Sequence, residues 1–252
     1  MALYAVLSDI HANREALDSV MEHVRNRGVE KILCLGDIVG YNADPDYCVG
    51  LLRECGVDSI AGNHDLMAVG KLGFENCWYR VAFTIVVTKR SMREENLRFL
   101  KELPTERIYE NRFALVHGSL RGPEEYMFSK ERVHASLEEM RKRLDSVNIC
   151  FFGHTHVRKV YEISGGDVRD ISLGKELKLC EEKIYFINPG SVDSTRKKGD
   201  GNADFLIYDS GSHLVEFISL PYDVEKTVRK SKELGYRMNI YDIAKYMLFH
   251  AF

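Results

Sequence analysis

The stretch Leu3-Tyr4-Ala5-Val6-Leu7-Ser8-Asp9-Ile10-His11 is an apolar run that ends in a carboxylate and an imidazole. Its five consecutive apolar residues predict a strand that is covered on both faces. A helical pattern follows over residues 12–27, and then a strand over 31–35, a helix over 46–54 and a strand over 57–61. This β-α-β-α-β order predicts parallel pairing with right-handed crossovers, and therefore an α/β fold.

The rest of the chain predicts helices first and short strands afterwards. Residues 75–103 are predicted to be helical with a break near 89–93, followed by strands at 107–109 and 113–117, a helix at 130–143 that Ser129 would cap, and a strand at 149–152. Short strands at 157–163, 183–187, 205–208 and 214–219 predict a second, largely antiparallel sheet. Residues 164–180 predict a hairpin or surface insertion, and residues 223–234 a final helix. With no linker in sight, we expect a single domain over residues 1–252.

The composition is that of an ordinary globular protein and argues against several classes of function. The formal net charge is −3, so nothing attracts a nucleic acid polymer or an anionic membrane over long range, and a phosphate-bearing ligand must be held locally. The N-terminal segment has no basic leader and no long apolar span. The six cysteines form no CxxC pair. We therefore expect a cytoplasmic protein with reduced thiols and no membrane span.

Four further apolar runs end in polar clusters like the first one. They lead to Gly36-Asp37, to Gly62-Asn63-His64-Asp65, to His117-Gly118 and to Gly153-His154-Thr155-His156. Ligands of open α/β sheets bind beyond the carboxyl ends of the strands, so we expect all five ends to converge on one edge. Three carboxylates, one amide and five imidazoles would meet there, which is more than a core tolerates without partners.

Metal ions would account for this concentration of side chains. Asp9 and His11, and likewise His154 and His156, are two residues apart and can chelate from one side of an extended strand end. A carboxylate such as Asp37 can bridge two cations, whereas one tetrahedral zinc ion would leave half of these groups without a role. Each motif alone is more typical of a turn, a helix cap or a core histidine. Only their occurrence together, at five strand ends, indicates a metal centre.

Together, Asp9-x-His11, Gly36-Asp37, Gly62-Asn63-His64-Asp65, His117 and Gly153-His154-x-His156 resemble the motifs of the calcineurin-like metallophosphoesterase superfamily. With Asn188-Pro189-Gly190-Ser191 and no cap domain, the chain is similar to the compact bacterial and archaeal phosphodiesterases of that superfamily. The resemblance implies a four-layer α/β/β/α sandwich in which two mixed sheets are flanked by helices.

The resemblance also implies a role for each residue. One metal ion would be bound by Asp9, His11, Asp37 and His156, and the other by Asp37, Asn63, His117 and His154. His64 would face the scissile phosphate, and Asp65 would orient its imidazole. The mixed nitrogen and oxygen ligands suit two divalent transition metal ions, such as manganese, iron, zinc, cobalt or nickel, better than magnesium.

The expected reaction is the hydrolysis of a small or nucleotide phosphodiester. A water that bridges two cations loses a proton near neutral pH and attacks phosphorus, while His64 would stabilise charge or protonate the leaving oxygen. We expect Asn13, Arg14 and Tyr41 to contact the substrate, since they follow the first two motifs and offer an amide, a cation and an aromatic ring. The basic run at residues 196–198 is a further candidate, although such a run is more typical of a solvated turn.

Alternatives remain open. The same ligands would serve a dinucleoside polyphosphate hydrolase or a phosphomonoesterase, because the substrate range depends on loops. A catalytically silent scaffold of this fold lacks the equivalent of His64, which is present here. The aspartate and arginine that phosphoprotein phosphatases carry after Gly-Asp are missing, and neither the cap domain nor the basic face of polymer nucleases is evident. The oligomeric state is open and includes a homo-oligomer.

Overall fold

The β-α-β-α-β start of the chain is confirmed by the computed structural model, which describes all residues except 1, 76, 110, 145, 196–200 and 237–252. Its elements are β1 (Leu3–Leu7), α1 (Arg14–Asn26), β2 (Lys31–Cys34), α2 (Pro45–Glu54) and β3 (Asp58–Ser59). The three strands pair in parallel. Helix α2 begins at Pro45. Proline suits the first turn of a helix because a backbone N–H at that position would have no partner within the helix, so its absence costs nothing.

The described strands form two mixed sheets of six strands each. The first has the order β3-β2-β1-β11-β12-β9 and is completed by β9 (Glu176–Lys178), β11 (Ala203–Asp209) and β12 (Leu214–Leu220). The second has the order β4-β5-β6-β10-β7-β8 and consists of β4 (Glu106–Tyr109), β5 (Phe113–Val116), β6 (Ile149–Phe151), β7 (Lys159–Ser164), β8 (Asp167–Asp170) and β10 (Ile184–Asn188). In both sheets parallel strands continue into antiparallel ones, as at β1 and β11 or at β10 and β7.

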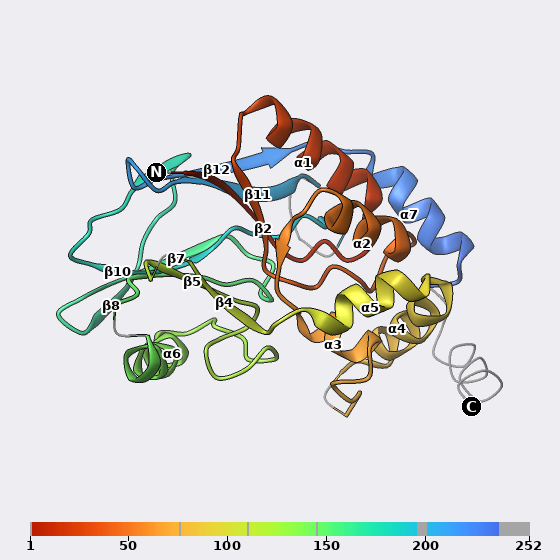
Figure 1. Ribbon diagram of the computed structural model, residues 1–252, viewed down its shortest axis with the longest axis horizontal. Coiled ribbons are helices and arrows are strands. Elements are labelled where there is room, and N and C mark those ends of the chain that lie inside the picture. The colour runs from red at the N-terminus through yellow and green to blue at the C-terminus, as the bar shows by residue number, and fades with distance from the viewer. Residues whose placement is uncertain (1, 76, 110, 145, 196–200, 237–252) are drawn as a thin grey trace.

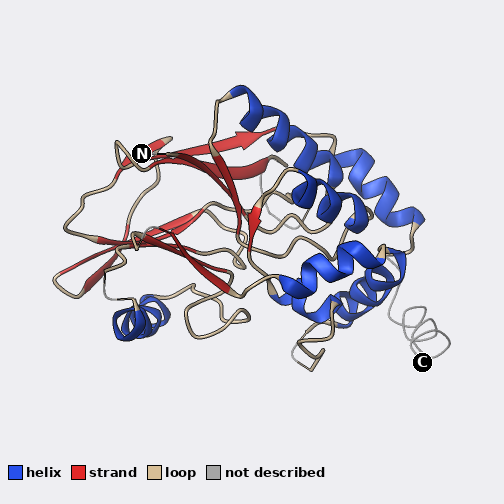
Figure 2. Ribbon diagram, viewed as in Figure 1, coloured by secondary structure: helices blue, strands red, loops and turns tan. Residues whose placement is uncertain are grey.

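Alternating side chains divide the core into separate apolar layers. In β1, Tyr4 and Val6 belong to the layer between the two sheets, whereas Ala5 and Leu7 belong to the layer beneath the helices. A further cluster joins the second sheet to helix α6 (Lys130–Arg143). Of the remaining helices, α1, α2 and α7 (Val224–Glu233) lie on the side of the first sheet. The helices α3 (Asn63–Ala68), α4 (Tyr79–Ser91) and α5 (Glu94–Glu102) pack against one another and against α2 at one end of the sheets (Figures 1 and 2). The expected α/β/β/α sandwich is confirmed.

The prediction that the late strands form a sheet of their own is wrong. β7, β8 and β10 extend the sheet of β4–β6, while β9, β11 and β12 join β1 in the other one. Alternation of apolar and polar residues indicates that a segment is a strand, but it does not indicate which other strand the segment pairs with. Residues 164–180 do begin with a hairpin, because β8 pairs with β7, and they then cross to the edge of the first sheet as β9.

The helix predictions agree with the structure at several points. The break at residues 89–93 separates α4 from α5, and the side chain of Ser129 caps α6 by accepting a hydrogen bond from the amide of Arg132. Among the described helices, none has the length and apolar character that a membrane span requires. The basic run at 196–198 lies outside the described residues. The apolar layer that both sheets share supports the single domain, which stays a prediction.

Candidate metal centre

The five polar clusters follow strands of both sheets rather than of one. Asp9, Asp37 and Asn63 come after β1, β2 and β3, while His117 and His154 come after β5 and β6. The expectation of a single sheet edge is therefore corrected, because the clusters meet where one end of each sheet faces the other. Bonds across the sheets hold them there, since Nδ1 of His117 contacts the carbonyl oxygen of Leu35 at 2.7 Å and the His154 amide donates to Oδ2 of Asp9 at 3.1 Å.

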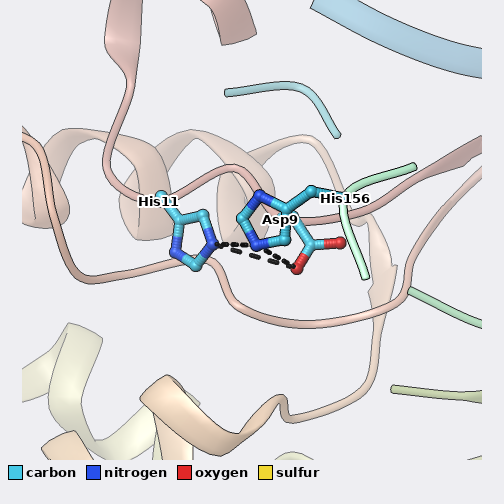
Figure 3. A group of neighbouring side chains, drawn as sticks. All are labelled: Asp9, His11 and His156. Atoms are coloured by element: carbon cyan, nitrogen blue, oxygen red, sulfur yellow. Dashed lines mark hydrogen bonds and ion pairs between the residues drawn. The ribbon is translucent and has the colours of Figure 1, made fainter. Parts of the chain in front are cut away.

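Asp9, His11 and His156 form the first group of neighbouring ligand atoms (Figure 3). Oδ1 of Asp9 lies 3.8 Å from Nε2 of His11 and 3.4 Å from Nε2 of His156. The two Nε2 atoms are 3.1 Å apart, so both rings present a nitrogen to the same small volume. Three ligand atoms that converge in this way can hold one metal ion.

Asp37 links the remaining groups. Asp37, His117 and His154 form one set, and His11, Asp37 and His64 form another. Oδ2 of Asp37 lies 3.3 Å from Nε2 of His117 and 3.8 Å from Nε2 of His11. A single carboxylate thus faces imidazoles from both sides, which is the arrangement that a bridge between two cations needs.

Hydrogen bonds to backbone carbonyls orient three of the imidazoles. Nδ1 of His11 faces the carbonyl of Val39 at 3.3 Å, and Nε2 of His154 faces the carbonyl of Glu124 at 3.2 Å. Because a carbonyl only accepts, these nitrogens and Nδ1 of His117 carry a hydrogen, so in the neutral ring the opposite nitrogen is the one that can bind a metal ion. Backbone carbonyls therefore select the tautomer that ligates.

Buried atoms without partners test whether a metal would fit. Oδ1 of Asp9, Oδ1 of Asn63 and Nε2 of His117 are buried and have no hydrogen-bond partner among the described residues. Leaving such an atom unsatisfied costs about 1–3 kcal/mol. All three belong to residues expected to be ligands, so divalent cations would satisfy the atoms that the protein leaves unpaired.

Burial and mutual charge shift the pKa values at the centre. Burial alone would raise the pKa of Asp37, but the imidazoles of His117 and His64 hold it well below its usual range. Burial and the neighbouring His117 lower the pKa of His154 to about 3. Burial alone would lower the pKa of His117, whereas the carboxylate of Asp37 raises it to about 9. Asp37 and His154 are thus already in their ligating forms, and His117 would exchange a proton for a metal ion.

Five of the seven expected ligands adopt the left-handed backbone conformation that glycine favours. The φ angles of Asp9, His11, Asp37, His154 and His156 are 55°, 50°, 52°, 62° and 58°. This conformation costs roughly 1–2 kcal/mol for a residue other than glycine, and the surrounding structure must enforce it. Sequence patterns do not indicate this shared geometry.

Asp65 has other contacts than those expected. Its Oδ1 accepts hydrogen bonds from the amides of Ile38 and Val39 at 2.9 and 3.1 Å, and its Oδ2 accepts one from Gly62 at 2.9 Å. Nδ1 of His64 has no hydrogen-bond partner among the described residues. The structure therefore contradicts the expected contact of Asp65 with the imidazole, because this carboxylate binds the two backbone segments that carry Asp37 and Asn63.

A cavity of about 1020 Å³ opens above the candidate ligands. Its lining includes Asp37, Asn63, His64, His154 and His156. Tyr41 also lines it, as expected for a substrate contact, and the centroid of its ring lies 4.7 Å from those of His11 and His64. The ligand groups thus lie within reach of a small molecule.

Asn13 and Arg14 do not line this cavity, which corrects the prediction that they contact substrate. Asn13 is fully buried, caps α1 by accepting from the amide of Ala16, and donates to Oδ1 of Asp193 at 2.7 Å. The guanidinium of Arg14 lies near Asp18, with Nε 3.4 Å from its Oδ2, and stacks over a tyrosine of α2. Both side chains stabilise the start of α1 instead.

The lining also contains residues that the sequence did not indicate. Trp78, Tyr126 and Phe128 contribute aromatic rings, and Arg80 contributes a cation. None of them follows a strand or belongs to a motif. The signal that could have found them is the spacing Tyr126-x-Phe128 together with the only tryptophan of the chain, since large aromatics in polar loops are uncommon without a function.

Residues 2–211 match the family model of the calcineurin-like phosphoesterase superfamily domain. The chain belongs to this superfamily. An uncharacterized protein of the archaeon Methanocaldococcus jannaschii is 36% identical over 234 residues, which cover 91% of each chain. Membership in the calcineurin-like phosphoesterases makes the chain a phosphoester hydrolase by family, and its Asp and His groups are candidate sites for divalent metals.

Solved structures agree with this assignment. A metallophosphoesterase from Sphaerobacter thermophilus superimposes with a TM-score of 0.78 at 29% identity, over 96% of this chain and 97% of that one. A hypothetical protein from Pyrococcus horikoshii superimposes with a TM-score of 0.72 at 18% identity, over 98% of both chains, and thus shares the fold. The calcineurin-like sandwich is therefore matched over nearly its whole length.

Proposed function

We propose that this calcineurin-like phosphoesterase is a two-metal phosphodiesterase that hydrolyses small or nucleotide phosphodiesters. The position of Asp37 between two groups of imidazoles, at the wall of the cavity, carries this proposal. One ion would be held by Asp9, His11, Asp37 and His156, and the other by Asp37, Asn63, His117 and His154. The unpartnered buried atoms of Asp9, Asn63 and His117 support this division.

Two divalent cations at these ligands would lower the pKa of a water shared between them and stabilise charge on the phosphoryl oxygens. Among the protein groups, His64 lines the cavity, and its Nε2 lies 3.9 Å from Oδ2 of Asp37. Burial lowers the pKa of His64 although the neighbouring carboxylate of Asp37 opposes this, so the neutral ring is favoured near neutral pH. A phosphate group would favour protonation, and His64 would then donate a proton or hydrogen bond to the phosphoryl or leaving oxygen.

The charge of the cavity favours a diester over the alternatives. Among the lining residues that the structure describes, Arg80 is the single lysine or arginine. A phosphodiester carries one negative charge, whereas a phosphomonoester carries about two near neutral pH and a dinucleoside polyphosphate carries several. Each extra charge needs a cationic partner when it leaves water. We therefore place the diester first and keep the other two as competing substrates.

The proposed metal ligands support the choice of metal ion, and the cysteines support the proposed location. Imidazole nitrogens beside carboxylate and amide oxygens suit manganese, iron, zinc, cobalt or nickel. All six cysteines lie in the described part of the chain and are free, which supports a reducing, cytoplasmic location.

An activity panel tests the proposed function. The chelated protein is reconstituted with Mn²⁺ and assayed on a diester, a monoester and a dinucleoside polyphosphate, with the chelated protein as the control. We expect metal-dependent turnover that is fastest on the diester. A diester rate at the level of the buffer blank beside a fast monoester rate would contradict the diester assignment. If two independent preparations of the protein bind no metal and hydrolyse none of the three substrates, the protein would be a catalytically silent scaffold.

A further inference from the structure

We propose that Trp78, Tyr126 and Phe128 bind a planar ring of the substrate, so that the enzyme selects phosphodiesters that carry a nucleobase. We name these three side chains the aromatic rim. The inference rests on the proposed function, and it adds the substrate class that the metal ligands leave open.

The aromatic rim is exposed to an unusual degree. Trp78, Phe128 and Tyr126 are 77%, 62% and 50% exposed, although all three line the same cavity as the candidate ligands. Burying rings of this size against a ligand is favourable, and a fully desolvated aromatic anchor is a typical feature of a binding pocket. The rim therefore offers ring faces that a bound ligand would cover.

The rim is joined directly to the candidate metal centre. The ring of Tyr126 stacks on the imidazole of His154 with centroids 3.9 Å apart and 26° between the planes. Phe128 is stacked with Tyr126 at 5.3 Å and 6°. Glu124, from the same segment, accepts the bond from His154 through its carbonyl oxygen. A ring held at the rim would thus have its phosphate within a short distance of the metal ligands.

Two segments of the chain supply the rim. Trp78 lies immediately before α4, whereas Tyr126 and Phe128 lie in the segment between β5 and α6. Stacking needs only a flat unsaturated surface, and every nucleobase provides one. The three rings therefore favour nucleobases as a class over aliphatic groups, without naming one base.

Size and charge exclude a long polymer as the preferred ligand. The cavity of about 1020 Å³ is at the upper end of the range for small-molecule sites, which is roughly 300–1,000 Å³. Polymers are bound through several basic residues along the backbone, and here the described lining provides Arg80 alone. The ligand that fits this lining is a small diester with one base and one negative charge.

Trp78 is the only tryptophan in the chain, so intrinsic fluorescence reports directly on the rim. The Mn²⁺-loaded protein is titrated with adenosine 5′-monophosphate and, separately, with ribose 5-phosphate, which has the same sugar and phosphate without the base. We expect saturable quenching by the nucleotide and little by the sugar phosphate. Equal quenching by both ligands, or none by the nucleotide, would overturn the inference.

Kinetics provide the second measurement. The p-nitrophenyl ester of thymidine 5′-phosphate is compared with methyl p-nitrophenyl phosphate, because both release the same leaving group. Stacking contributes roughly 1–3 kcal/mol per base, so we expect Trp78→Ala and Phe128→Ala to lower the preference for the thymidine ester about 5- to 150-fold. Phe74→Ala is the matched control, since this aromatic is 38% exposed and does not line the cavity.

The two proposals fail in different ways. If the wild type hydrolyses the methyl ester as well as the thymidine ester, the rim has no role in selection, and the proposed phosphodiesterase stands. If neither ester is hydrolysed with any metal, the proposed function fails, and the fluorescence titration still decides whether the rim binds a base. An unchanged preference in both rim variants also refutes the inference.

Discussion

His64 is the residue that we propose to act in turnover without binding metal. It lines the cavity, and it is not needed to complete either proposed ligand set. We expect His64→Ala to retain its metal content while kcat falls about 10²–10⁴-fold, the usual contribution of an acid–base group. Metal analysis and steady-state kinetics on the purified variant check this. His134→Ala is the control, since His134 is exposed on α6, and full activity of the His64 variant would remove His64 from the mechanism.

The position of a residue next to a motif predicted the location of some side chains correctly and of others wrongly. Asp9 and His11 were predicted to be ligands because they follow a buried strand, and the structure brings their ligand atoms together with His156, which lines the cavity. Asn13 and Arg14 come only two and three residues after His11, yet the left-handed turn at His11 and the start of α1 direct them elsewhere. Adjacency in sequence does not predict the direction of a side chain once the backbone turns.

Helix α7 is held against α1 by an ion pair that titrates. Lys230 Nζ lies 2.7 Å from Oε1 of Glu15, and Oγ1 of Thr227 donates to the other oxygen at 3.0 Å. Burial alone would raise the pKa of Glu15, but these bonds lower it overall. A carboxyl group whose pKa is lowered in the folded state stabilises the fold above its unfolded pKa of about 4.3, and this contribution is lost as the pH falls through the folded pKa.

We therefore expect Glu15→Gln to be less stable than the wild type by about 1–2 kcal/mol at pH 7, because a charge-assisted hydrogen bond is lost. The difference should shrink as the pH falls below about 4, where the wild-type carboxyl group is protonated as well. Urea unfolding at a series of pH values measures it. A difference at pH 3 as large as that at pH 7 would contradict the assignment of this pair.

The elements could be predicted to different degrees. β1, α1, β2 and α2 combine strong local patterns with neighbours in sequence, and all were expected. β11 pairs with β1, which lies about 200 residues away at the other end of the chain, so this pairing depends on tertiary packing that no local pattern contains. The aromatic rim was missed for the same reason, because two distant segments form it.

Metal binding should stabilise the whole molecule. The proposed ligands exist together only in the folded chain, so a metal at 100 times its dissociation constant adds about 2.7 kcal/mol. For a chain of this size each kcal/mol corresponds to roughly 2–4 °C, and we expect a chelator to lower Tm by about 5–10 °C. Thermal unfolding with EDTA, and again after adding excess Mn²⁺, checks this. Magnesium should restore less, and an unchanged Tm in all conditions would argue against resident metals.

The left-handed backbone conformation of the expected ligands also affects which substitutions the protein would tolerate. Glycine adopts this conformation without the penalty that aspartate and histidine carry. Exchanging His154 or His156 for glycine would therefore relieve backbone strain, but it would also remove a proposed ligand and the stabilisation that a bound metal ion would provide. The strained backbone at these two positions is therefore the conformational cost of the metal binding that we propose for them.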